Sequence, residues 1–169
     1  MTARGLATAV ALAIAVVVAG VLVFWPAPAT GPEPLRYGRD TCAGCRMTIG
    51  RPGFGGEMRD HAGRLTTYDD VGCLLRAMVA THREVPEAWV EDHDGGGLVP
   101  LVTAHFVRAD GAETPMGYDI LAFKDADAAS RYAAAHAGRQ LALEDVLHDA
   151  DTLLATPRHP GAAGEGGRR

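Results

Sequence analysis

The sequence predicts an α+β protein in which two small ββαβ units follow an N-terminal hydrophobic helix. Three observations lead to this prediction. An uncharged apolar run lies near the amino terminus, short strand-like segments then alternate with helix-like segments, and this order of segments occurs twice. The repeat indicates an internal duplication. The composition is that of an ordinary globular protein, with 47% hydrophobic and 22% charged residues in a chain of 169.

The apolar run predicts a membrane anchor or a signal peptide within residues 1–30. Residues 6–25 contain no charged side chain, and as a helix they would span about 30 Å, the thickness of a bilayer's hydrocarbon core. Arg4 precedes the run, so the positive-inside rule places the rest of the chain outside the cytoplasm. A cleaved signal peptide is the alternative, although its apolar region is usually only about 7 to 15 residues long. Residues 26–34 are rich in proline and predict a semi-rigid spacer.

The folded part is expected at residues 31–156, and its first ββαβ unit at about 37–95. The expected strands lie at residues 56–60, 64–68 and 88–91. A hairpin turn at 61–63 joins the first two strands. Asp69 or Asp70 can cap the following helix, in which apolar residues recur at helical spacing and form one face.

The second unit, at about 96–150, repeats this outline. Its expected elements are two strands, a helix, a closing strand and a terminal helix, at residues 102–108, 118–123, 128–135, 139–143 and 144–155. Asp125 or Asp127 can cap the first helix, and Gly138 lies where a C-terminal glycine belongs. The Gly-rich tail at 157–169 cannot bury enough apolar surface to become ordered.

Charge and cysteine content exclude two classes of protein. The net charge is −5 and no run of five lysines or arginines occurs, so the chain lacks the electrostatic pattern of a nucleic-acid-binding protein. Three cysteines are too few, and odd in number, for a disulfide-stapled scaffold.

The segment DTCAGCRMTIG, residues 40–50, concentrates three sulfur atoms and permits three interpretations. The first is a redox pair, because C-x-x-C is the spacing of thioredoxin. There, however, the pair opens a helix after a strand, and residues 46–53 are a poor helix start. The second is structural zinc, which needs four ligands, and no second C-x-x-C or H-x-x-x-H is present.

The third interpretation is a soft-metal site. Thiolate and thioether ligands select Cu(I), and methionine is a poor ligand for zinc. If the chain is extended from Cys45 to Met47, both sulfurs point to the same side and can bind one ion. Cys42 can join them if residues 43–44 form a turn, and Arg46 favours the thiolate form of its neighbour. The alternative is that these sulfurs only pack in the core.

Other side chains can complete a metal site. Met116 follows a proline in a loop and is expected to be exposed, as a copper ligand or docking residue, unless it packs. An imidazole from His93 or His61 can supply a third ligand to Cu(I). Cys73 lies one residue off the apolar face of its helix and is expected to be a small buried thiol.

The motif Asp40-x-Cys42-x-x-Cys45-x-Met47 resembles that of the NosL family, the copper-binding accessory proteins of nitrous oxide reductase maturation. Similar stretches follow in the family's order, at residues 68–73, 88–92, 114–117, 121–123 and 135–138. Together they cover most of the folded chain. Two features differ: Arg46 stands where the family usually has glycine, and a peptide anchor stands where many members carry a lipid.

The resemblance implies two small ββαβ units and a Cu(I) chaperone that is not an enzyme. It also implies delivery of copper to an extracytoplasmic copper enzyme, nitrous oxide reductase, through a membrane assembly complex. A thiol-disulfide oxidoreductase using Cys42 and Cys45 is the alternative from another class, and it has no need of Met47. A zinc-stabilised interaction domain is a third hypothesis, which predicts that chelation unfolds the protein.

Overall fold

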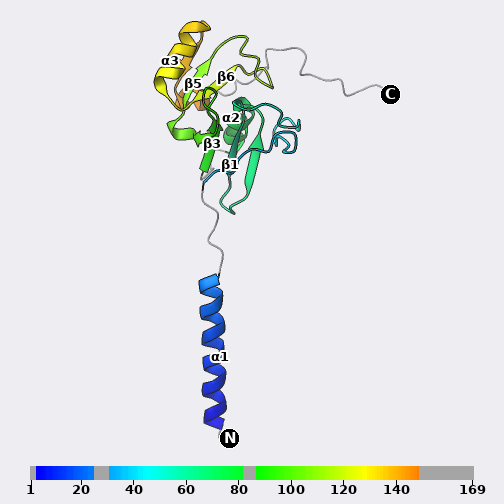
Figure 1. Ribbon diagram of the computed structural model, residues 1–169, viewed down its shortest axis with the longest axis vertical. Coiled ribbons are helices and arrows are strands. Elements are labelled where there is room, and N and C mark those ends of the chain that lie inside the picture. Colours follow the sequence, from blue (N-terminus) through cyan, green and yellow to red (C-terminus); the bar gives the residue numbers. More distant parts are fainter. Residues whose placement is uncertain (1–2, 25–30, 82–86, 149–169) are drawn as a thin grey trace, which may run out of the picture. The chain divides into compact units, whose positions relative to one another are not determined.

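The computed structural model describes residues 3–24, 31–81 and 87–148 (Figure 1). The chain divides into two compact segments, residues 1–30 and 31–169. The first contains helix α1 (Ala3–Phe24). Among the described residues, no helix combines the length and the hydropathy that crossing a membrane requires. The anchor remains a prediction from the sequence, and residues 26–30 of the spacer lie outside the described residues.

The second segment begins with a four-stranded antiparallel sheet in the order β2-β1-β3-β4. Its strands are β1 (Gly56–Arg59), β2 (Leu65–Tyr68), β3 (Glu87–Glu91) and β4 (Leu98–Pro100). Helix α2 (Val71–Ala80) follows β2 and contacts β1 and β2 through its apolar face. Asp70 caps this helix, because its carboxylate accepts a 2.7 Å hydrogen bond from the Gly72 amide.

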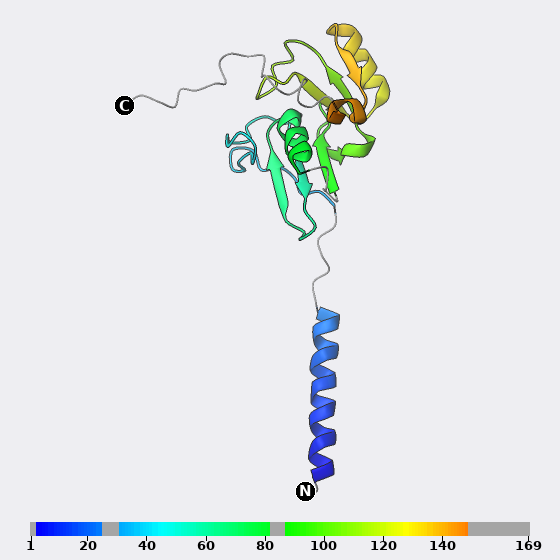
Figure 2. The same cartoon turned by 180° about the vertical axis from the view of Figure 1, so that it is seen from behind.

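A three-stranded antiparallel sheet in the order β6-β5-β7 follows. Its strands are β5 (His105–Arg108), β6 (Ile120–Phe123) and β7 (Arg139–Leu141). Helix α3 (Ala126–Ala135) packs on all three strands and is capped by Asp125, which accepts a 2.9 Å hydrogen bond from the Ala128 amide. Figure 2 shows α3 and the short helix α4 (Leu143–His148) from behind.

The order β1-β2-α2-β3 recurs as β5-β6-α3-β7, and the strand orders β2-β1-β3 and β6-β5-β7 correspond. We call these the first and second ββαβ units. The predicted α+β class is confirmed. The duplication of sequence stays a prediction, because a shared order of strands does not by itself show it. The end of the predicted terminal helix, 149–155, and the tail at 157–169 lie outside the described residues.

Three local predictions were wrong. A short strand, β4, was missed, and Leu101–Thr103 is a 3-10 turn (η1), so the predicted strand at 102–108 begins only at His105. Pro100 ends β4 because it has no amide to donate to the ladder. Gly138 is not left-handed; Ala137 has that conformation, with φ 49°. Gly138 is instead needed for packing, since a Cβ there would lie 3.0 Å from the Arg108 carbonyl oxygen.

The larger of two apolar core clusters contains residues of both ββαβ units. It includes Leu74 of α2, Val90 of β3, Phe106 of β5 and Ile120 of β6. Gly72 permits the closest approach in this core, because a Cβ at that position would lie 2.3 Å from the ring of Tyr118. The start of α2 is therefore pressed against the loop that precedes β6, which positions Asp69 and Cys73 at the two sides of the cap.

Candidate metal centre

Residues 40–49 form a small hairpin that presents the C-x-x-C pair. The Cys42 amide donates to the Met47 carbonyl at 2.8 Å, and the Ile49 amide donates to the Asp40 carbonyl at 2.9 Å. Residues 43–45 form the turn that was predicted to bring in Cys42. The Ala43 amide donates to the Thr67 carbonyl at 2.9 Å, so the turn is docked on β2 beside the start of α2.

The chain is not extended from Cys45 to Met47, so the condition for presenting both sulfurs on the same side is not met. Arg46 has φ 68°, in the left-handed region, because the chain must reverse there to close the hairpin. A residue other than glycine pays about 1–2 kcal/mol for this conformation. Cys45 is consequently half-buried, whereas the Met47 side chain is 45% exposed. The two sulfurs are not presented as neighbours on one face of a strand.

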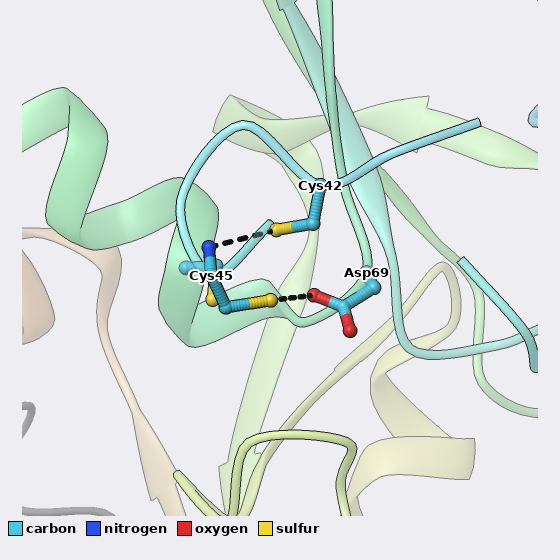
Figure 3. A group of neighbouring side chains, drawn as sticks. Cys42, Cys45 and Asp69 are labelled. Carbon is cyan, nitrogen blue, oxygen red and sulfur yellow. Dashed lines mark hydrogen bonds between the residues drawn. The ribbon is translucent and has the colours of Figure 1, made fainter. Parts of the chain in front are cut away.

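Four side chains converge at this point: Cys42, Cys45, Cys73 and Asp69. Their ligating atoms all lie within 4.8 Å of one another. The Cys45 Sγ contacts Asp69 Oδ1 at 3.2 Å, and the Cys45 amide donates to Cys42 Sγ at 3.5 Å (Figure 3). Two metal–sulfur bonds of about 2.3 Å span at most about 4.6 Å, so a small contraction brings these atoms to one ion. All three cysteines are free thiols.

Two members of this group, Asp69 and Cys73, were not predicted as site residues. Asp70 takes the capping role and also accepts a 2.8 Å hydrogen bond from the Met116 amide. Asp69 is therefore free to face the thiols. Cys73 is buried, as expected, but it points into the cluster. The signal in the sequence was a second aspartate, Asp69, beside the capping Asp70 and close before Cys73. It acquires meaning only through the docking of Ala43 on Thr67.

The cluster holds little negative charge in the absence of a cation. The thiol of Cys73 donates a hydrogen bond that lowers the pKa of Cys42 well below its usual value. The same hydrogen bond, together with burial, raises the pKa of Cys73, and burial raises that of Cys45. Burial also raises the pKa of Asp69 to about 7. One thiolate is stabilised by protons on its neighbours, and a bound cation would replace those protons.

A pocket of about 280 Å³ opens beside the cluster. Its walls are formed by Gly44, Cys45, Cys73, Arg76, Ala77, Met116 and Tyr118. Cys42 is fully buried and does not line this pocket, so Cys45 and Cys73 are the thiols that face it. Met116 was expected to be exposed but is half-buried in the pocket wall. The Arg76 guanidinium donates a 2.5 Å hydrogen bond to the Tyr118 hydroxyl across the same wall.

The structure does not bring the two predicted histidines into the cluster. The ring of His93 packs against Phe54, Phe123 and Tyr132, with centroid distances of 5.1, 5.6 and 5.4 Å. Its Nδ1 lies 3.1 Å from the Gly53 carbonyl oxygen. His61 is exposed in the turn between β1 and β2. Neither ring belongs to the group of ligating atoms found among the described residues.

Comparison with known proteins agrees with the resemblance noted in the sequence. The model of the NosL family matches residues 37–150, which is most of the chain. The chain belongs to the NosL family. Among solved structures, it is similar to the copper chaperone NosL from Shewanella denitrificans, with a TM-score of 0.59 and 17% identity; the match covers 71% of this chain and 96% of that one. No curated protein matches the chain.

The donor atoms of this NosL-family chain suit a thiophilic metal ion. Three thiols are soft ligands of the kind that bind Cu(I), and the carboxylate of Asp69 is a harder donor beside them. The ligands come from the hairpin, from the end of β2 and from the first turn of α2. A metal ion here would therefore join the hairpin to the folded scaffold.

Proposed function

We propose that this NosL-family protein is an extracytoplasmic Cu(I)-binding metallochaperone that delivers copper for assembly of a copper enzyme. The observation that carries the proposal is the convergence of three thiols within 4.8 Å of one another on a NosL fold, with two of them facing an open pocket. Soft thiolates give affinity for Cu(I). The open side gives an acceptor access to the ion.

The proposal also gives a role to the thioethers of Met47 and Met116. Met47 is exposed two residues after Cys45, and Met116 lines the pocket with Cys45 and Cys73. A thioether is a neutral soft ligand that exchanges without release of a proton. We assign the thiols to holding Cu(I) and the two methionines to its entry and exit.

The proposed recipient is nitrous oxide reductase or its membrane assembly complex. The family resemblance supports this recipient, and the apolar run at residues 6–25 supports tethering at the extracytoplasmic face of the membrane. Copper is cargo in this function, and the protein catalyses no reaction.

An anaerobic Cu(I) titration of the reduced protein against a competing chelator tests the proposal. We expect one tightly bound Cu(I) per chain. Met47→Leu and Met116→Leu should weaken binding or slow release, whereas Met58→Leu, at a half-buried position on β1, serves as the matched control. Failure of the wild-type protein to compete for Cu(I) would refute the function. Equal behaviour of all three variants would refute only the role of the thioethers.

Zinc binding is a second candidate, because three thiols and a carboxylate form a four-ligand set that zinc accepts. The two metals differ in their need for the harder donor. Asp69→Asn should weaken Zn²⁺ binding and leave Cu(I) binding nearly unchanged, since Cu(I) prefers the thiolates. Tighter competition for Zn²⁺ than for Cu(I), together with unfolding on chelation, would favour the zinc-stabilised domain.

A further inference from the structure

Arg46 occupies a conformation that its residue type disfavours. Its φ of 68° places it in the left-handed region, which glycine adopts without steric cost. The side chain is exposed and lies between half-buried Cys45 and exposed Met47. Residues with strained backbone of this kind cluster at functional sites. An arginine at this position, in place of glycine, therefore suggests a function for its side chain.

The exposed charged residues of the segment 36–51, which contains the hairpin, are all positive. Residues 36–51 contain four arginines, all exposed, and one aspartate. That aspartate, Asp40, is buried and paired with Arg36 at 2.7 Å. The whole chain carries a net charge of −5, so this segment is a basic patch on an acidic protein. Within the described part of the chain, the guanidinium of Arg46 makes no ion pair.

A second exposed arginine borders the same thiols from another element. Arg76 on α2 lines the pocket that Cys45 and Cys73 face, and its contact is with the neutral hydroxyl of Tyr118. One exposed guanidinium, that of Arg76, therefore lines the pocket from α2, and a second belongs to Arg46, which directly follows the pocket residue Cys45 on the hairpin. Guanidinium groups bind carboxylates through two parallel hydrogen bonds.

We propose that Arg46 and Arg76 form a cationic rim that docks an acidic surface of the protein that exchanges copper with this chain. This inference rests on the proposed function and adds the chemistry of the partner: its copper-accepting ligands are flanked by aspartate or glutamate. Complementary charge speeds encounter and fixes orientation more than it adds affinity. An anionic lipid is the less suitable occupant, because a headgroup brings no soft ligand to the thiols.

Two synthetic acceptor peptides test the rim. Both carry the same Met-x-x-Met copper ligand pair, flanked by glutamates in one and by lysines in the other. Cu(I) transfer from the loaded full-length protein is followed by stopped flow. Arg46→Glu should slow transfer to the glutamate peptide about 10-fold and speed transfer to the lysine peptide. In 1 M salt, where the Debye length is about 3 Å, both differences should nearly vanish.

Arg131→Glu is the matched control, since Arg131 is exposed on α3 and the reversal changes the net charge equally. It should leave both transfer rates within about 2-fold of wild type. Equal effects of the Arg46 and Arg131 reversals, or no effect of either, would overturn the rim. So would Arg46-dependent binding to phosphatidylglycerol vesicles without any change in peptide transfer, which would assign the patch to a membrane surface.

Equilibrium Cu(I) affinity separates the failure of this inference from failure of the function. Arg46→Glu should retain wild-type affinity, because the side chain is not among the clustered ligands. If the wild-type protein binds no Cu(I), the proposed function is wrong. If Cu(I) binds with equal affinity in both proteins and the transfer rates are also equal, the function stands and the cationic rim is wrong.

Discussion

The two ββαβ units share a strand order and a way of starting their helices, yet among the residues that the structure describes only the first unit gathers metal-ligating side chains. In both, an aspartate caps the helix that follows the second strand: Asp70 in the first unit and Asp125 in the second. The residue before the cap differs. Asp69 is buried among thiols, whereas Lys124 is exposed. The helix start is a scaffold, and the residues around the cap decide its chemistry.

The hairpin at residues 40–49 makes the second difference. It docks on the end of β2 through Ala43 and Thr67 and carries two of the three thiols to the helix start. At the corresponding end of β6, the ring of Phe123 packs with His93 and Tyr132. The same scaffold thus supports a polar, ligand-rich cluster in one unit and an aromatic cluster in the other.

The largest expected effect is on Cu(I) affinity, which depends on the thiol cluster that distinguishes the first unit from the second. The double variant Cys42→Ser/Cys45→Ser should lower Cu(I) affinity by more than about 100-fold, because even partners outside the ligand shell are worth about 10- to 100-fold. Competition with bicinchoninate under anaerobic conditions measures this. The helix content of the double variant should persist, since the core that both units share sets the scaffold. If the variant retained wild-type Cu(I) affinity, the metal would have to bind elsewhere.

The variant Gly72→Ala tests how closely the start of α2 packs against Tyr118. The added Cβ would lie 2.3 Å from the Tyr118 ring, so we expect a loss of about 3 kcal/mol in the free energy of unfolding. The control is a change of one methyl group on the exposed face of α3, Ala134→Gly, which should cost about 1 kcal/mol. Urea unfolding of both variants is the measurement. Equal losses would show that the approach to Tyr118 is not tight.

The buried cap of the first unit predicts a dependence on pH. Burial raises the pKa of Asp70 to about 6, so the folded state holds its proton more tightly than the unfolded chain does. The resulting stabilisation is complete below about pH 4 and is lost as the pH rises through about 6. Relative to that of Asp70→Asn, the free energy of unfolding of the wild type should fall by about 2 kcal/mol between pH 4.5 and pH 8. Urea unfolding of the reduced, metal-free proteins checks this; a constant difference would contradict it.

The smallest expected effect is a gain in stability. Arg46→Gly removes the cost of a left-handed arginine and should raise the free energy of unfolding by about 1 kcal/mol. The same variant lacks a rim charge and should transfer copper more slowly to the glutamate peptide. Thermal unfolding of the metal-free protein gives the first quantity. A variant that is no more stable would show that the hairpin relaxes around Arg46.

Local patterns predicted most of the fold. Helical spacing and capping aspartates placed α2 and α3, and short strand-like segments, two of them joined by a hairpin turn, placed β1, β2 and β3. The missed β4 has three residues, too few for a pattern, and the left-handed Ala137 has no signature in its residue type. In the site, spacing identified Cys42 and Cys45. Asp69 and Cys73 join them only through the docking of distant segments, which spacing does not encode.

The most direct test of the central claim is X-ray absorption of the Cu(I)-loaded protein, compared between wild type and Cys73→Ser. Cys73 comes from the helix start rather than from the C-x-x-C hairpin, so it joins the scaffold to the site. We predict a sulfur shell at about 2.3 Å that loses one thiolate in the variant, with a Cu(I) affinity lowered by at least about 10-fold. An unchanged shell and an unchanged affinity would contradict a metal centre built from the three thiols.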